Sequence, residues 1–248
     1  MKVKIKHPKT EGGGSSFGAS RIKQALLCPA SKQYAQSEWA SDAMALGSLV
    51  HRYVAEYWYE RLSEKQRARH RFWRPLVKDL ASISRKGSLR QQALILFDAW
   101  AKADRSRLYY EPIWIEREFE WRGLTTKPDH VVRIDDGVAI IDLKTSSKPF
   151  APKRFSMQAS LAMAIMRQHY GNRLLGFFHD HVYATKKVVD VSLKKIHVSQ
   201  RDEERALALG LRALEADDTI AIGMVTGAQC FRCAGQIDCY DEGESDDS

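Results

Sequence analysis

Three side chains in two short segments are of the types that hydrolyse phosphate esters with the help of a metal ion. Asp129 follows a proline, and a single leucine separates Asp142 from Lys144. Two carboxylates suit a hard divalent cation such as Mg²⁺ or Mn²⁺, and the carbonyl of Leu143 offers a further oxygen ligand. Such a cation activates water and neutralises charge on a phosphate, while an amine stabilises the attacking hydroxide or the transition state. The pattern indicates cleavage of a phosphodiester, although Asp-x-Lys also arises by chance at solvated strand ends.

A β-hairpin would bring these side chains together. Residues 131–134 form a short β-branched run that ends at Asp-Asp-Gly, and an Asp-Gly pair favours a hairpin turn. A second strand is expected over residues 138–144. Because antiparallel partners have Cβ atoms roughly 5 Å apart, Asp129 would lie near Asp142 and Lys144. The last two side chains would share one face of their strand.

An earlier strand and a helix carrying a histidine are also expected. Apolar and charged residues alternate from Ile113 to Trp121, which predicts a half-buried strand with its glutamates on one face. Further upstream, His51 follows Gly47 by four residues in a segment whose apolar residues recur at helical spacing. His51 could be another metal ligand, whereas a histidine considered alone is better explained as a hydrogen-bonded core residue.

The four cysteines form a second group that could bind metal. Cys28 stands near the beginning, while Cys230, Cys233 and Cys239 form a C-x2-C-x5-C pattern near the end. Four thiolates can hold an iron–sulfur cluster or a structural zinc ion, and the spacing is compatible with both. Disulfides are disfavoured because residues 1–6 do not form a hydrophobic signal peptide and intracellular thiols stay reduced. A cytoplasmic location, in a bacterial cell or a phage-infected host, is the corresponding expectation.

In chain order, these motifs resemble one known family. They are Ser20-Arg21, Cys28-Pro29, Gly47-x3-His51, Pro128-Asp129, Asp142-x-Lys144, Gln158 and the C-terminal cysteine pattern. Over residues 20–240 the chain resembles the RecB-like PD-(D/E)xK nuclease superfamily. More narrowly, it is similar to the iron–sulfur branch, which includes AddB-type nuclease domains and CRISPR-associated and phage-encoded exonucleases.

The resemblance implies an α/β fold with a restriction-endonuclease-like core, in which helices flank a central mixed sheet behind a helical N-terminal region. The implied ligands of Mg²⁺ or Mn²⁺ are His51, Asp129, Asp142 and the Leu143 carbonyl. The implied catalytic side chains are Asp129, Asp142, Lys144, Glu116 and Gln158, the last of which would orient substrate or water. The resemblance also implies a [4Fe-4S] cluster, with zinc as the alternative, that joins the two ends of the domain through Cys28, Cys230, Cys233 and Cys239.

Two of these assignments have alternatives. Glu118 is the alternative to Glu116, which we prefer because Glu-Arg-Glu-Phe follows the family's usual spacing. Family members commonly carry a tyrosine four residues after the glutamine, where this chain has Ala162. The contact made by that tyrosine is therefore absent or supplied elsewhere, and Gln158 could instead be a solvated helix residue.

Composition favours DNA as the partner. The formal charge is +8, and the last eight residues hold five acidic and no basic side chains, so the preceding 240 carry +13. A net positive charge of this size attracts the phosphate backbone of nucleic acids. The candidate DNA contacts are Lys148, Lys153 and Arg154 after the active-site strand, and Arg71 and Trp73 in a basic stretch with interleaved aromatics that could equally be a solvated helix face.

The 248 residues, 44% of them hydrophobic, are enough for one substantial core, and no apolar run approaches the ~20 residues that cross a membrane. We expect a flexible basic and Gly-Ser segment over 1–16, one nuclease domain over 17–240 and a flexible acidic tail over 241–248. Within the domain, 62–105 would be a helical insertion and 230–239 the cysteine motif. Further expected elements are helices near 20–37, 43–62, 65–83, 88–104, 152–170 and 201–216, and strands near 174–184 and 187–199.

The expected function is therefore metal-dependent hydrolysis of DNA. By analogy with the small proteins that the chain resembles, we expect an exonuclease for single-stranded or resected ends in phage or bacterial recombination or replication. Two alternatives stay open at this point: an endonuclease specific for branched or flapped DNA, and a non-catalytic DNA-binding or assembly protein that retains the fold.

Overall fold

The computed structural model describes residues 17–27, 42–63, 87–105, 110–146, 155–184 and 189–218. Several sequence-based predictions fall outside these ranges, namely the cysteine site, the candidate DNA contacts, the helix expected near 65–83 and the two terminal segments. These stay predictions.

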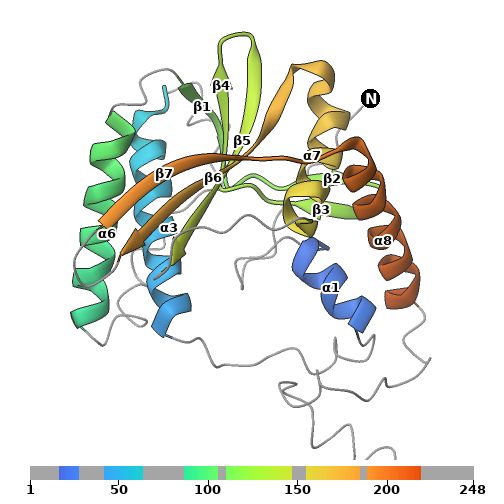
Figure 1. Cartoon of the computed structure of the whole chain (residues 1–248), viewed down its shortest axis with the longest axis horizontal. Coiled ribbons are helices and arrows are strands. Elements are labelled where there is room, and N and C mark those ends of the chain that lie inside the picture. Colours follow the sequence, from blue (N-terminus) through green and yellow to red (C-terminus); the bar gives the residue numbers. More distant parts are fainter. Residues whose placement is uncertain are drawn as a thin grey trace, which may run out of the picture.

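A five-stranded mixed sheet forms the centre of the described structure (Figure 1). In spatial order the strands are β1 (Tyr110–Ile115), β4 (His130–Ile134), β5 (Gly137–Ser146), β6 (Leu174–Ala184) and β7 (Val189–Ile196). β5 and β6 run parallel, and all other neighbours run antiparallel. Parallel neighbours need a crossover connection, which contains helix α7 (Met157–Tyr170). The expected α/β fold with a central mixed sheet is therefore observed.

The predicted hairpin is formed by β4 and β5. His130 pairs with Ile141, and Ile134 pairs with Gly137, so Asp135 and Asp136 make the turn. Asp135 takes the left-handed backbone conformation with φ of 50°, which a short polar side chain tolerates. Gly137 leaves room for the side chain of Leu175, because a Cβ atom at this position would lie 2.6 Å from Cδ1 and Cδ2 of that leucine.

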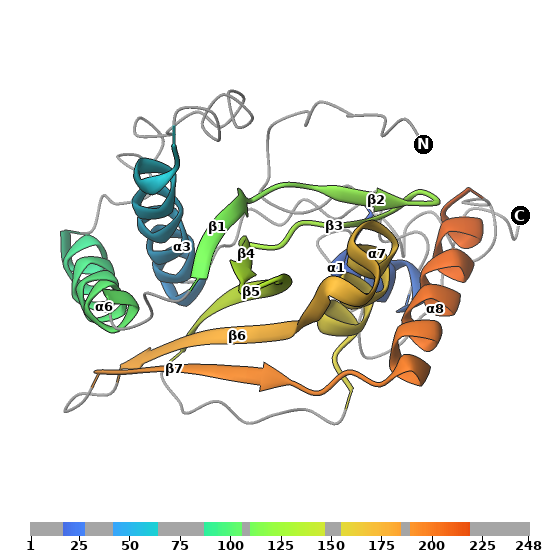
Figure 2. The same ribbon diagram turned by 90° about the horizontal axis from the view of Figure 1, so that it is seen from above.

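Helices cover both faces of the sheet (Figures 1 and 2). On one face lie α3 (Asp42–Arg61) and α6 (Gly87–Arg105); on the other lie α1 (Ala19–Leu27), α7 and α8 (Gln200–Asp218). Side chains of β5 alternate between two cores: Ile141 and Leu143 pack with α3 and α6, whereas Val138 and Ile140 pack with α7. This alternation directs Asp142 and Lys144 toward the α7 face. None of the described helices combines the length and the apolar composition needed to span a membrane.

The strand expected over 113–121 is interrupted. β1 ends just before Glu116, which has φ of 44° and donates its backbone N–H to the carbonyl of Asp129 at 2.9 Å. The chain then enters a separate hairpin of β2 (Phe119–Trp121) and β3 (Leu124–Thr126). The prediction that the glutamates of this stretch share one strand face is therefore wrong. Alternation continues across the break, and neither glycine nor proline marks it.

Other boundaries agree more closely. The helix expected near 152–170 begins at Met157, where Ser156 acts as the N-cap. The strand expected near 187–199 covers Val189–Ile196, and the last expected helix, near 201–216, covers Gln200–Asp218. Helical periodicity, strand alternation and the turn signal therefore predict most of the described elements.

Candidate active site

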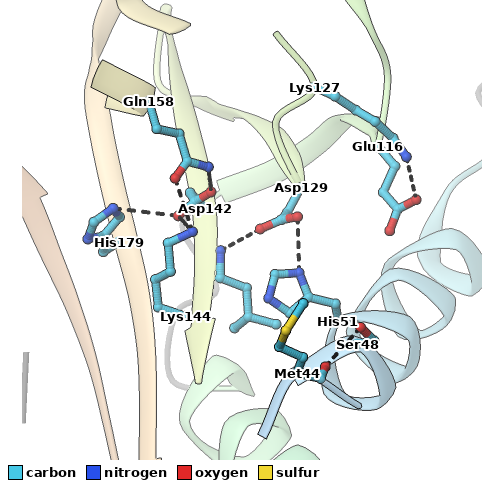
Figure 3. Close-up of polar contacts among 11 residues, drawn as sticks. Met44, Ser48, His51, Glu116, Lys127, Asp129, Asp142, Lys144, Gln158 and His179 are labelled. Carbon is cyan, nitrogen blue, oxygen red and sulfur yellow. Dashed lines mark hydrogen bonds and ion pairs between the residues drawn. The ribbon is translucent and has the colours of Figure 1, made fainter. Parts of the chain in front are cut away.

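Asp129 precedes β4 and its carboxylate bonds in two directions (Figure 3). Oδ2 accepts a hydrogen bond from the backbone N–H of Leu143 at 2.7 Å, and Oδ1 lies 3.1 Å from Nδ1 of His51. The first bond ties Asp129 to the neighbouring strand β5, and the second ties it to helix α3. The structure therefore brings the predicted residues Asp129, His51 and Leu143 together.

Asp142 is the centre of a second set of contacts, on the α7 side. Oδ1 accepts a hydrogen bond from Nε2 of Gln158 at 2.6 Å, and Oδ2 lies 2.7 Å from Nζ of Lys144. The Lys144 ammonium also donates to Oε1 of Gln158 at 3.2 Å, which closes a triangle of contacts. The Asp142 side chain is only 5% exposed, whereas that of Lys144 is 37% exposed. The lysine therefore has the freedom to reach a substrate that the buried carboxylate lacks.

The two carboxylates differ in acidity. Burial disfavours the ionised form of Asp129, but the charge and hydrogen bond of His51 hold its pKa well below the usual range. Burial and the charge of Asp129 raise the pKa of Asp142 to about 6, against the opposing effect of Lys144. Burial lowers the pKa of His51, but the Asp129 charge and hydrogen bond outweigh it and leave that pKa raised. Asp129 is thus the more acidic of the two carboxyl groups, and Asp142, whose pKa burial raises, takes up a proton more readily even though Lys144 lies close.

The donor chemistry of this site fits a hard divalent cation. Asp129 and Asp142 supply carboxylate oxygens, and Oδ2 of Asp142 accepts no aligned hydrogen bond although Lys144 is close. Within the described residues, no three His, Cys, Asp or Glu side chains are grouped so as to hold a metal ion, so the structure does not assemble His51, Asp129 and Asp142 into the implied ligand set. Mg²⁺ often uses only one or two carboxylates and completes its shell with water and substrate phosphates. The two aspartates therefore meet the side-chain requirement for Mg²⁺ or Mn²⁺.

Glu116 stands apart from these contacts. Its carboxylate lies 3.3 Å from Nζ of Lys127, and Figure 3 shows it directed to that lysine rather than to the Asp129 side chain. Glu116 reaches Asp129 through its backbone N–H instead. Its alternative, Glu118, is exposed after the end of β1. The structure does not bring the predicted upstream glutamate into the carboxylate network.

A buried histidine that the sequence analysis did not single out adjoins the site. His179 on β6 is the register partner of Asp142, and its Nε2 lies 3.5 Å from Oδ2 of that residue. Burial, followed by the charge of Lys144, lowers the pKa of His179 to about 4. The alternation Phe177, His179, His181 in the sequence places two imidazoles on one strand face, and this signal could have identified the residue.

The remaining predicted site residues lie outside the described part of the chain. These are the cluster ligands Cys28, Cys230, Cys233 and Cys239, and the DNA contacts Lys148, Lys153, Arg154, Arg71 and Trp73.

Comparison with known families agrees with the geometry of the carboxylates and the lysine. A family model described as the PD-(D/E)XK nuclease superfamily matches residues 16–240. The chain belongs to the PD-(D/E)XK nuclease superfamily. It is similar to a solved structure titled "Crystal structure of SSO0001", with 11% identity over 89% of this chain and 94% of that one, and a TM-score of 0.33. No curated protein matches the chain.

Membership in the PD-(D/E)XK superfamily supports a metal-dependent nuclease with DNA as substrate, and such nucleases generally use Mg²⁺ or Mn²⁺. The motif that names the superfamily occurs here as Pro128-Asp129 and Asp142-Leu143-Lys144. Ala162 of this nuclease is 1% exposed within the core that α7 shares with the sheet. The position four residues after Gln158 therefore serves packing in this chain.

Proposed function

We propose that this PD-(D/E)XK nuclease is an Mg²⁺- or Mn²⁺-dependent DNA exonuclease that acts on single-stranded or resected ends, in phage or bacterial recombination or replication. The observation that carries the proposal is the contact triangle of Asp142, Lys144 and Gln158 beside Asp129. It places a carboxyl group that could hold a cation beside an ammonium group that could stabilise charge on a phosphate. The preference for exonuclease action is supported by the resemblance of the motif order to small exonucleases.

Each side chain has a distinct role in this proposal. Asp129 and Asp142 would hold the cation, which when bound supplies Lewis-acid stabilisation of the phosphate and an activated water. His51 and the Leu143 N–H fix the orientation of Asp129. Lys144 would turn from Asp142 toward the substrate, where its ammonium would stabilise the negative charge on the attacking hydroxide or on the phosphate oxygens in the transition state.

Gln158 links two of these groups. Its amide nitrogen donates to Oδ1 of Asp142, and its carbonyl accepts from Nζ of Lys144. When Lys144 turns to the substrate, that carbonyl becomes available to accept a hydrogen bond from water. This position supports the role in orienting substrate or water that the motif implies.

The proposal includes a structural [4Fe-4S] cluster held by Cys28, Cys230, Cys233 and Cys239. Its support is the one-for-one match of cysteine order with the iron–sulfur branch. Protein purified without oxygen should be brown and contain iron and sulfide. Colourless protein with one bound zinc ion would overturn the iron assignment and leave a structural zinc site.

The test of function uses anaerobically purified protein with end-labelled linear and covalently closed circular DNA, each single- and double-stranded, in Mg²⁺ or Mn²⁺. We expect degradation of linear DNA only, and its loss in Asp142→Asn, which retains the shape of the side chain. DNA binding by that variant, measured in Ca²⁺, should be close to that of the unsubstituted protein. Cleavage of circular DNA would instead indicate an endonuclease, and absence of cleavage by cluster-loaded protein would contradict the nuclease proposal and favour the binding-protein alternative.

A further inference from the structure

His179 approaches the Asp142 carboxylate from strand β6. Its Nε2 atom lies 3.5 Å from Oδ2, and the two residues are direct partners in the parallel β5–β6 ladder. In Figure 3 the imidazole lies on one side of Asp142 and Asp129 lies on the other. The ring therefore approaches Asp142 from the side away from the second carboxylate.

The ring of His179 is held firmly. The residue is 8% exposed, and β6 is paired on both sides, so its backbone is fixed by two ladders. The ring of Phe177 contacts it edge to face, with 5.4 Å between ring centroids. Lys144, by contrast, is a long flexible side chain that is 37% exposed at the same carboxylate. His179 is the more rigid of the two groups near Oδ2.

Asp142 needs such a group during the reaction. In the structure, Nζ of Lys144 lies 2.7 Å from Oδ2, while Gln158 holds Oδ1. If Lys144 turns to the substrate, Oδ2 loses its nearest donor and Gln158 restrains only one oxygen. The χ2 torsion of aspartate is broad, so a carboxylate held at one oxygen can rotate.

We infer that His179 is a positioning residue that holds Oδ2 of Asp142 in its metal-binding orientation while Lys144 engages the substrate. The distance of 3.5 Å is longer than a formed hydrogen bond, and contacts of this kind tighten when the reacting complex assembles. The inference rests on the proposed nuclease function. It assigns a specific role to a residue outside the Pro-Asp, Asp-x-Lys and Gln motifs.

The test compares His179→Leu and His179→Gln with His181→Leu. His181 is a matched control because it lies two residues along the same strand face, is 2% exposed and bonds Oγ of Ser146 at 2.9 Å rather than Asp142. The measurements are Mn²⁺ affinity of DNA-free protein by electron paramagnetic resonance, kcat and KM on end-labelled single-stranded DNA, and Tm.

We expect His179→Leu to weaken Mn²⁺ binding and to lower kcat, each by about 10-fold or more, because loss of a group that orients a metal ligand usually has an effect of this size. KM for DNA should change little. His179→Gln should recover most of both, because its amide nitrogen can reach the position of Nε2. His181→Leu should lower Tm without the change in Mn²⁺ affinity.

Equal losses at positions 179 and 181, or unchanged Mn²⁺ affinity in His179→Leu, would overturn the inference. If the leucine variant does not fold, His179→Asn replaces it, because the shorter amide cannot reach Oδ2; equal Mn²⁺ affinity in the Asn and Gln variants would then contradict the role. The Mn²⁺ measurement is made without DNA, so failure of the nuclease assay contradicts the proposed function separately.

Discussion

At the scale of single residues, the site separates the acidities of two neighbouring carboxylates. The charge and hydrogen bond of His51 keep the pKa of Asp129 low, whereas burial raises the pKa of Asp142 to about 6. Groups whose environments drive their pKa values apart are typical of catalytic sites. Lys144 is the adjacent cation that favours the ionised form of Asp142, so the lysine serves the resting site as well as the reaction.

Replacement of that lysine tests its catalytic role. We expect Lys144→Met, which keeps the length of the side chain, to lower kcat by about 10²–10³-fold, the usual effect of removing one group that stabilises a developing charge. Lys102→Met is the control, because Lys102 is 69% exposed on α6 and pairs with Asp98 one turn away. Single-turnover cleavage at saturating protein gives the comparison. Similar rates in Lys144→Met and Lys102→Met would remove the lysine from the mechanism.

The sequence predicts residues well where their contacts are local. Asp129 precedes strand β4 and Asp142 lies on strand β5, and a two-residue turn joins these strands. A turn signal and strand alternation therefore suffice to predict that the two aspartates lie close together. His179 reaches Asp142 through a parallel pairing that depends on the α7 crossover, which no short-range pattern specifies. Strand alternation predicts Glu116 on a strand face. The prediction fails because Glu116 takes a left-handed backbone conformation that its residue type does not indicate.

At the scale of elements, α3 must lie close to β5 for His51 to contact Asp129. Gly47, one turn before His51, allows this approach, since a Cβ atom there would lie 3.1 Å from Oγ1 of Thr145 on β5. The sequence predicted the helix and its histidine. It did not predict the packing of α3 against β5 that sets a contact between residues 78 positions apart.

Gly47→Ala should therefore impair activity more than stability. Alanine favours the helix by about 1 kcal/mol over glycine, which offsets the crowding at Thr145, so Tm should change little. Displacement of α3 would misplace His51, and misplacement of this kind can lower kcat by up to about 10²-fold. Ser48→Ala, at an exposed neighbouring position, is the control. Recovery of kcat in the double variant Gly47→Ala/Thr145→Ala would show that crowding between residues 47 and 145 causes the loss. Wild-type activity in Gly47→Ala would show that α3 tolerates a side chain at this position.

A bidentate ion pair joins helices α7 and α8. Nε and Nη2 of Arg167 donate to the two carboxylate oxygens of Glu203 at 2.8 and 2.6 Å. The glutamate side chain is 8% exposed and the arginine side chain 41% exposed. Because α7 carries Gln158, this pair stabilises the layer on which one side of the site depends.

Arg167→Ala should lower the free energy of unfolding by about 1–2 kcal/mol, between the values for surface and buried pairs, because Glu203 would remain buried without this partner. Asp98→Ala is the matched control, since it breaks the exposed Lys102–Asp98 pair on α6 and should cost at most about 0.5 kcal/mol. Urea unfolding followed by circular dichroism measures both. Equal losses in the free energy of unfolding would show that the burial of Glu203 does not increase the contribution of its ion pair to stability.

At the scale of the whole molecule, cation binding should stabilise the fold. A ligand at 100 times its Kd adds about 2.7 kcal/mol, which for a domain of this size raises Tm by roughly 5–10 °C. We expect Mn²⁺ to produce such a shift in differential scanning calorimetry and Asp142→Asn to abolish it. The variant retains all four cysteines, so its lack of response separates this site from the cysteine site. An equal shift in the variant would place the bound Mn²⁺ elsewhere.

The site takes its groups from both helical layers of one sheet: His51 comes from α3 on one face, and Gln158 comes from α7 on the other. Loosening of either layer would separate catalytic partners while the central strands stay paired. Heat should therefore inactivate the enzyme before it melts the sheet.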